Sequence, residues 1–382
     1  MCKFYIKFST FLTLSVVIWF LVPAYSHAES LSCGKYESAL EIEICDNLEI
    51  RTINFHMNQV YQAEFAKLSK SGQKLLRDNQ LQFLSDLESI CFSTDPLIVT
   101  HRPVDMGEYG LAEGAKSSDD CLSAHLQART KELETAVQHS ADRTFLRLTS
   151  LRLRRPGPDA PSGYSDHVIE ESLALVQIDD PRTPSEQDFN TWTKKLLKRS
   201  VCGMRCGDDS TSDDGCSLDR QRDGFAEANM DIWAEVSAAI LADDIAAVQN
   251  DIGYYGLGAA HPVARESRAL WSFKLGRELK AEDIFDSTKN WDAVLSAYAQ
   301  RHVRPTIDGI SKEDLDPIAS IAKTENWSFE RDGLRLIYGQ YELGGYLASA
   351  EALLPWHVIA PFLKPNGILD WRALAGDGEI AR

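Results

Sequence analysis

The sequence predicts an α+β protein in which a helical bundle stapled by disulfides precedes an α+β domain with a mainly antiparallel sheet. Three observations predict this fold class. Between Cys45 and Cys91 the apolar residues recur at steps of three and four, which is the period of helices buried on one face. From Met230 onward, apolar and polar residues alternate as they do in half-buried strands. A proline- and glycine-rich stretch, 156–163, separates the two patterns and is the expected linker.

Residues 1–28 have the pattern of a secretory leader. Lys3 and Lys7 form a charged start, an apolar core covers 8–22, and small residues lie at the expected cleavage position. The apolar core is short for a membrane span. We therefore predict cleavage after Ala28 and a periplasmic or secreted protein without a membrane-spanning helix.

The charge excludes one class of partner and favours another. With 44% hydrophobic and 25% charged residues, the composition is that of a soluble globular protein. The net charge is −17, and loss of the leader with its two lysines would bring it to −19. An acidic surface repels nucleic-acid phosphates and speeds encounters with cationic partners. We expect no nucleic acid, although acidity that serves only solubility remains an alternative.

Export makes disulfides the expected state of the cysteines, because an oxidising compartment favours them. Of eight cysteines, Cys2 leaves with the leader, and four frame the helical region: Cys33, Cys45, Cys91 and Cys121. Their spacing allows three pairings. Two disulfides there would each stabilise the fold by roughly 3 kcal/mol.

Three further cysteines crowd one acidic segment of the second half. We expect one local disulfide, with Cys202 and Cys216 as the candidate pair, and one thiol left over from Cys206. The segment offers no nearby histidine for zinc and lacks the spacing of a calcium-binding helical loop. We expect no metal and no cofactor.

A set of residues between Cys33 and Leu133 resembles the LprI-type lysozyme-inhibitor domain of exported bacterial proteins. The residues that carry the resemblance are Glu41 to Cys45, Ile50, Ile53, Tyr61, Gln80, Phe83, Leu84, Cys91, Cys121, Leu122, Arg129 and Leu133. The resemblance implies a helical fold and the disulfides Cys33–Cys45 and Cys91–Cys121. It also implies a lysozyme as the partner.

The loop between Cys91 and Cys121 is a candidate binding surface. It is long, lacks a periodic pattern and contains Glu108 and Tyr109. A disulfide at its ends would present these side chains to a partner, while a solvated excursion without a role is the alternative.

The first unit is expected to end in a helix that continues to about Arg143. Arginines 147, 152, 154 and 155 follow, and we expect them to complement a helix end or to pair with acids of the next domain. The predicted division is a helical domain at 29–155, a linker at 156–163 and an α+β domain at 164–382.

The second domain is expected to open with a strand at 168–178. Thr183, Pro184 and Glu186 then have the pattern of a helix start. Further strands are expected from Met230, with a glycine-rich turn at 254–262, and at 270–275 and 329–338. A helical stretch is expected at 282–298.

This half is similar to the C-terminal domain of RsiV-type anti-sigma factors. The residues that carry the likeness are Tyr255, Gly258 to Pro262, Gly276, Leu279, Asp283 to Phe285, Gly333, Leu334, Tyr341, Glu342 and Tyr346. In those anti-sigma factors the domain binds lysozyme as part of sensing. The signalling role itself is not expected here.

Catalysis is not expected. His261 is the most tempting residue, because histidine titrates near neutrality, yet its place between glycines and Pro262 favours a role in fixing a turn. The sequence contains no nucleophile-elbow serine and no His-Glu-x-x-His helix.

We therefore predict an exported cell-envelope binding protein that captures a lysozyme or a similar cationic, wall-cleaving enzyme. The candidate contacts are Glu108, Tyr109, Tyr254, Tyr255 and His261. One alternative is a structural module that binds peptidoglycan and never meets lysozyme. The other is a wall-modifying enzyme that uses His261.

Overall fold

The computed structural model describes residues 38–96, 98, 117–164, 167–206, 229–242, 244–307, 310–344 and 349–375. The predicted leader, Cys33, Glu108, Tyr109 and Cys216 lie outside the described residues.

The first part of the chain is helical. It contains α1 (Ala39–Asp46), α2 (Leu48–Phe65), α3 (Lys70–Cys91) and α5 (Ser118–Glu134). Each helix begins at a residue whose side chain accepts a hydrogen bond from the first turn: Ser38, Asn47, Ser69 and Ser117. Their apolar faces close on a buried core that includes Ile44, Ile50, Met57, Tyr61, Leu76, Leu87, Leu122 and Leu126.

A seven-stranded sheet follows. Its strands are β1 (Val137–Ser140), β2 (Arg143–Arg154), β3 (Ile169–Ile178), β4 (Met230–Ala242), β5 (Ile245–Gly256), β6 (Val263–Ser272) and β7 (Arg277–Glu278), in sequence order. All neighbouring pairs are antiparallel except β3 and β4, which are parallel. The helix α6 (Pro184–Cys206) connects these two strands, as a parallel pair requires.

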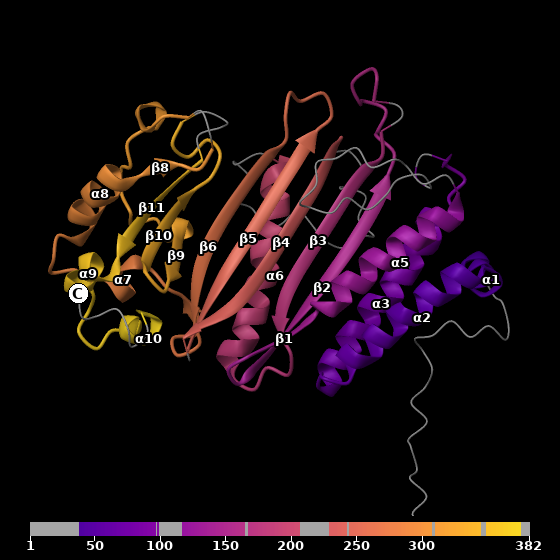
Figure 1. Ribbon diagram of the computed structural model, residues 1–382, viewed down its shortest axis with the longest axis horizontal. Coiled ribbons are helices and arrows are strands. Elements are labelled where there is room, and N and C mark those ends of the chain that lie inside the picture. Colours follow the sequence, from indigo (N-terminus) through magenta and orange to yellow (C-terminus); the bar gives the residue numbers. More distant parts are fainter. Residues whose placement is uncertain are drawn as a thin grey trace, which may run out of the picture.

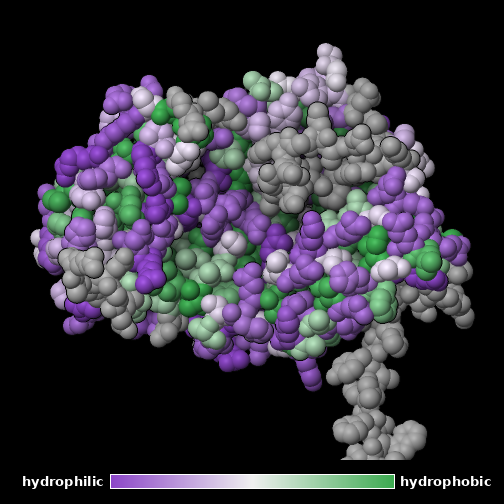
Figure 2. Space-filling view, viewed as in Figure 1, coloured by the Kyte–Doolittle hydropathy of each residue, from purple (hydrophilic) through white to green (hydrophobic). Residues whose placement is uncertain are grey.

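The two faces of this sheet differ. On one face α6 packs Phe189, Leu197 and Val201 against apolar side chains of the strands. Figure 1 shows α6 behind the sheet and the helical part beside β1 and β2. On the other face, hydrophilic side chains lie over β5 and β6 (Figure 2).

A second, four-stranded antiparallel sheet forms the last part. It has the order β8 (Arg304–Pro305), β11 (Ala350–Pro355), β10 (Gly333–Tyr338) and β9 (Trp327–Glu330). The helices around it are α7 (Ala281–Ile284), α8 (Trp291–His302), α9 (Trp356–Ile359) and α10 (Trp371–Ala375). The α+β class with N-terminal helices and a mainly antiparallel sheet is confirmed.

Two expectations about single elements are wrong. The helix expected to reach Arg143 ends at Glu134, and β1 and β2 form a hairpin whose turn has Ala141 at φ 54°. The strand expected at 329–338 is the hairpin β9–β10, which turns at Arg331 and Asp332. Gly333 follows this turn, and a Cβ atom there would lie 2.2 Å from the carbonyl oxygen of Leu354 in β11.

The predicted linker at 156–163 connects β2 to β3, and these strands pair from Phe145 with Ile178 to Arg154 with Ile169. Residues 137–154 therefore lie in the sheet rather than in the helical part. The division into domains remains a prediction.

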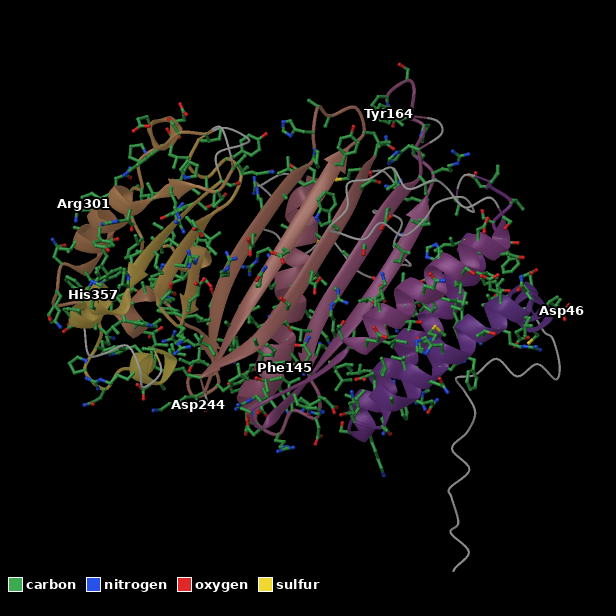
Figure 3. The ribbon with its side chains drawn as sticks, in the orientation of Figure 1. Asp46, Phe145, Tyr164, Asp244, Arg301 and His357 are labelled. Atoms are coloured by element: carbon green, nitrogen blue, oxygen red, sulfur yellow. A yellow bond between two sulfur atoms is a disulfide. The ribbon has the colours of Figure 1, made fainter. Side chains whose placement is uncertain are left out.

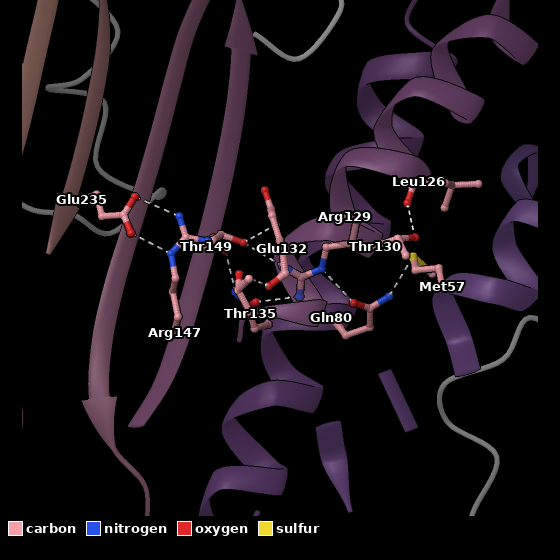
Figure 4. A network of polar contacts seen from close by, with 11 residues as sticks. Met57, Gln80, Leu126, Arg129, Thr130, Glu132, Thr135, Arg147, Thr149 and Glu235 are labelled. Atoms are coloured by element: carbon pink, nitrogen blue, oxygen red, sulfur yellow. Dashed lines mark hydrogen bonds and ion pairs between the residues drawn. The ribbon is translucent and has the colours of Figure 1, made fainter. Parts of the chain in front are cut away.

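A buried polar network joins the helical part to the sheet (Figure 4). Arg129 of α5 is 3% exposed and donates to Gln80 and Asn79 of α3 at 3.1 and 2.8 Å. It also donates to Thr149 of β2 at 2.7 Å and to Glu132 at 2.9 Å.

Within the described ranges, no helix has both the length and the apolar character needed to span a bilayer.

Candidate functional site

Three carboxylates form a row across the sheet face that α6 does not cover. Glu235 of β4 pairs in register with Asp251 of β5, and Asp251 pairs with Glu266 of β6. The residues that flank them in sequence point toward α6; Asn250, for example, hydrogen-bonds Ser200 of that helix. Directly opposed residues place their Cβ atoms about 5 Å apart, where like charges destabilise a sheet. We call Glu235, Asp251 and Glu266 the carboxylate row.

Arginines neutralise the two ends of the row. Arg147 of β2 reaches across β3 and donates from Nε and Nη2 to both oxygens of Glu235, at 2.9 and 3.0 Å (Figure 4). Arg268 pairs with Glu266. The two-bond geometry of Arg147 makes this the stronger kind of ion pair.

Asp251, in the middle of the row, accepts hydrogen bonds from a neutral amide, which compensates its charge less than an arginine would. The Nε2 atom of Gln249 lies 2.9 and 3.1 Å from its two oxygens. Burial and then the charge of Glu266 raise the pKa of Asp251 to about 6. A neighbouring arginine opposes this shift but does not cancel it. The row therefore holds negative charge that its own arginines compensate only in part.

Aromatic side chains continue the same face along β4 and β5. The indole of Trp233 lies over Gly253 and leaves no room for a side chain there: a Cβ atom at Gly253 would be 2.0 Å from the ring. Asp231 and Tyr255 form the next cross-strand pair on this face. A hydrogen bond with Tyr164 raises the pKa of Tyr255, and Figure 3 labels Tyr164 at this end of the sheet.

The structure separates two of the predicted contact residues. Tyr254 and Tyr255 are adjacent in β5, so their side chains point to opposite faces of the sheet. Tyr255 lies on the face of the carboxylate row, and Tyr254 pairs with Ile232 on the face that α6 covers. The two candidate contact residues therefore lie on opposite faces of the sheet.

His261 lies at the tip of the β5–β6 hairpin. Its Nδ1 atom is 3.1 Å from the carbonyl oxygen of Pro262, and its Nε2 atom is 3.3 Å from the hydroxyl of Tyr341. Tyr341 has φ 64°, a strained value for a residue with a side chain. These contacts favour a role for His261 in holding the hairpin tip against the second sheet.

The predicted Cys91–Cys121 disulfide is present and joins the end of α3 to the start of α5. Cys45 and Cys202 are also disulfide-bonded, and their partner sulfurs lie outside the described side chains. In the described part of the chain, Cys91, Cys121 and His125 lie close enough together to hold a metal. Because the two sulfurs are bonded to each other, this group offers no thiolate ligand as it stands.

The carboxylate row is the feature that the sequence did not reveal. Its members are far apart along the chain, and only the strand register brings them together. The alternation of apolar residues from Met230 is a signal that could have found one member, since it implies that Glu235 lies on the polar side of β4.

Comparison with known proteins finds a family model that matches part of the chain. Residues 282–356 match the family model described as "Protein of unknown function (DUF3298)". This stretch is therefore similar to the DUF3298 family. The matched stretch runs from α7 to the start of α9 and includes the second sheet. This match is consistent with the C-terminal likeness inferred from the sequence, whereas the LprI-type likeness of the helical part remains a prediction.

Two solved structures of DUF3298 family proteins are similar to the chain. The first, from Bacteroides fragilis NCTC 9343, is 13% identical with a TM-score of 0.43 and covers 60% of this chain and 96% of its own. The second, from Pseudomonas aeruginosa PAO1, is 13% identical with a TM-score of 0.40 and covers 59% and 97%. None of the curated proteins matches the chain.

Proposed function

We propose that this protein is an exported cell-envelope binding protein that captures a cationic protein, with a lysozyme-type wall-cleaving enzyme as the partner. The observation that carries the proposal is the carboxylate row. Cross-strand carboxylates destabilise a sheet, so a partner that brings lysine or arginine side chains to the row would relieve their repulsion. Binding rather than catalysis is the activity that we assign to this face.

Two further features support the proposal. Trp233 and Tyr255 lie on the same face and offer flat apolar surface, which suits the aliphatic stems and guanidinium planes of basic side chains. The net charge of −17 adds a long-range attraction for a basic protein. The Cys91–Cys121 disulfide fits the oxidising compartment that export would supply.

The test is calorimetric binding of hen-type lysozyme to the wild type and to a variant with Glu235→Gln, Asp251→Asn and Glu266→Gln. We expect the variant to bind roughly ten-fold or more weakly, because several charge contacts are lost together. The matched control carries Asp244→Asn, Glu282→Gln and Glu313→Gln, three exposed acids away from the row. It removes the same charge and should change affinity only slightly.

Equal losses in the row variant and in the control would mean that net charge alone attracts lysozyme, and the assigned face would be wrong. Absence of lysozyme binding by the wild type would contradict the proposed partner. Purified cell wall would then be the next ligand to titrate, because the aromatic side chains on this face could also stack on sugar rings.

A further inference from the structure

The helical part exposes large apolar side chains. Leu48 and Phe55 of α2 are 67% and 62% exposed, and Ile42 of α1 is 45% exposed. Leu48 and Phe55 are two helical turns apart, so they project from the same side of α2. Figure 2 shows hydrophobic side chains between hydrophilic ones on this helical part of the surface. A lone exposed apolar residue is ordinary, whereas Leu48 and Phe55 on one side of a helix together offer an apolar area that a partner can bury.

Acidic side chains surround the start of α2. Residues 39–55 contain Glu41, Glu43, Asp46 and Glu49 against a single base, Arg51. From α5, Asp119 accepts a hydrogen bond from Asn47 Nδ2 at 2.9 Å. A hydrogen bond with Asp119, followed by burial and the charges of Asp119 and Asp46, raises the pKa of Glu43. Negative charge is therefore crowded beside the exposed apolar residues.

The surface is held in a fixed shape before any partner arrives. Asn47 caps α2 through Glu49 and Ile50 and also ties this helix to α5. Cys45 is disulfide-bonded at the end of α1, and the Cys91–Cys121 disulfide fixes the start of α5. A rigid surface loses little conformational entropy when it binds, which favours affinity.

The charge selects the occupant. An anionic lipid surface would be repelled by these acids, and a second copy of this chain would bring the same acids to face them. A protein with a basic rim around an apolar centre fits both features. We propose that Leu48 and Phe55, with Asp46 and Glu49 beside them, form a docking surface for a basic protein. We call this docking surface the α2 surface. Figure 3 labels Asp46 at the outer end of the helical part.

This inference rests on the proposed function in one respect, since it assumes that the captured partner is a basic protein. The α2 surface differs from the carboxylate row in its place on the molecule and in how its contacts respond to salt. Contacts of the carboxylate row are electrostatic and weaken as salt rises. The apolar contacts of the α2 surface persist at about 1 M salt, where the Debye length is about 3 Å.

The test compares a Leu48→Ser, Phe55→Ser variant with the wild type in calorimetric titrations of hen-type lysozyme at low salt and at about 1 M salt. We expect roughly a ten-fold or greater loss of affinity at both salt concentrations, as for two residues at the centre of an interface. The matched control carries Leu275→Ser and Val294→Ser, two apolar residues that are 45% and 46% exposed and lie outside the helical part. It should bind lysozyme as the wild type does. Circular dichroism and the thermal midpoint check that both variants remain folded.

Polylysine serves as a second probe because it supplies positive charge without an apolar centre. The Leu48→Ser, Phe55→Ser variant should bind polylysine as tightly as the wild type. Lysozyme binding that the variant leaves unchanged would overturn the α2 surface and leave the proposed function standing. If the wild type binds lysozyme neither at low salt nor at high salt, both the α2 surface and the proposed function are overturned. Concentration-dependent self-association that the variant abolishes would show that a second copy is the occupant and would also overturn the inference.

Discussion

Asp251 illustrates how three neighbouring strands set the chemistry of a single carboxyl group. Its pKa is about 6 in the folded protein, raised first by burial and then by Glu266. The ordinary value, which holds in the unfolded chain, is about 3.9. Between these values the folded state binds the proton more tightly than the unfolded state does. The stabilising effect of the proton is therefore complete below about pH 4 and is lost as the pH rises through 6.

The substitution Asp251→Asn tests this linkage. The amide keeps the shape of the side chain and removes its charge, so it should raise the free energy of unfolding at pH 7.5 by about 1–2 kcal/mol. This figure is discounted because the carboxyl is partly exposed and solvent screens it. At pH 4 the two proteins should be nearly equal in stability. Urea denaturation at both pH values measures the difference, with Asp244→Asn as the control. A gain that is the same at pH 4 and pH 7.5 would refute the assigned pKa.

At the scale of elements, the contact between α5 and β2 decides how the helical part sits on the sheet. The guanidinium of Arg129 is buried and contacts α3, β2 and Glu132 of its own helix. The hydroxyl of Thr149 in turn donates to Glu132 at 2.6 Å. Burial lowers the pKa of Arg129, and Glu132 opposes that shift. The network depends on all of its members, because Arg129 and Gln80 are buried away from water and would be left without partners there.

Replacement of Arg129 by methionine should therefore be destabilising. The long apolar side chain fills much of the space but removes the guanidinium donor of Gln80, Asn79 and Glu132, of which Glu132 keeps the Thr149 hydroxyl. We expect a loss of about 1–3 kcal/mol in the free energy of unfolding, because a buried acceptor is left unsatisfied while the charge of Glu132, 39% exposed, is screened by solvent. Lys131→Ala, an exposed basic residue on the same helix, is the control and should change stability by less than about 0.5 kcal/mol. Similar, small effects of both substitutions in chemical denaturation would show that the network contributes little.

Local signals predicted some elements and missed others. The helices that begin at Leu48 and Pro184 were readable because an apolar period coincides with capping residues, and Glu186 indeed accepts from the backbone of Arg182 and Thr183. The hairpin at 137–154 was missed because its strands are specified by pairing with β3, a partner distant in sequence. The same limit applied to the site. The alternation of apolar residues from Met230 implies that Glu235 faces the polar side of its strand, but no local pattern gives the register that aligns it with Asp251 and Glu266.

At the scale of the molecule, three polar contacts hold the helical part against the sheet. Asp179 at the end of β3 accepts from the backbone of Ser69 at the start of α3 at 2.7 Å. Arg129 contacts Thr149 in the middle, and Arg155 pairs with Asp95 beyond the end of β2. Of the arginines expected to pair with acids of the second domain, Arg147 pairs with Glu235, whereas Arg155 pairs with Asp95 of the helical part. The carboxylate row and the α2 surface therefore belong to parts of the molecule that are fastened together.

The measurement that tests the central claim most directly is calorimetric titration of hen-type lysozyme into residues 29–382, at low and at physiological salt. The account predicts one-to-one binding that weakens as the salt concentration rises, because the carboxylate row supplies charge that salt screens. Absence of heat at both salt concentrations, or an affinity that does not change with salt, would contradict it.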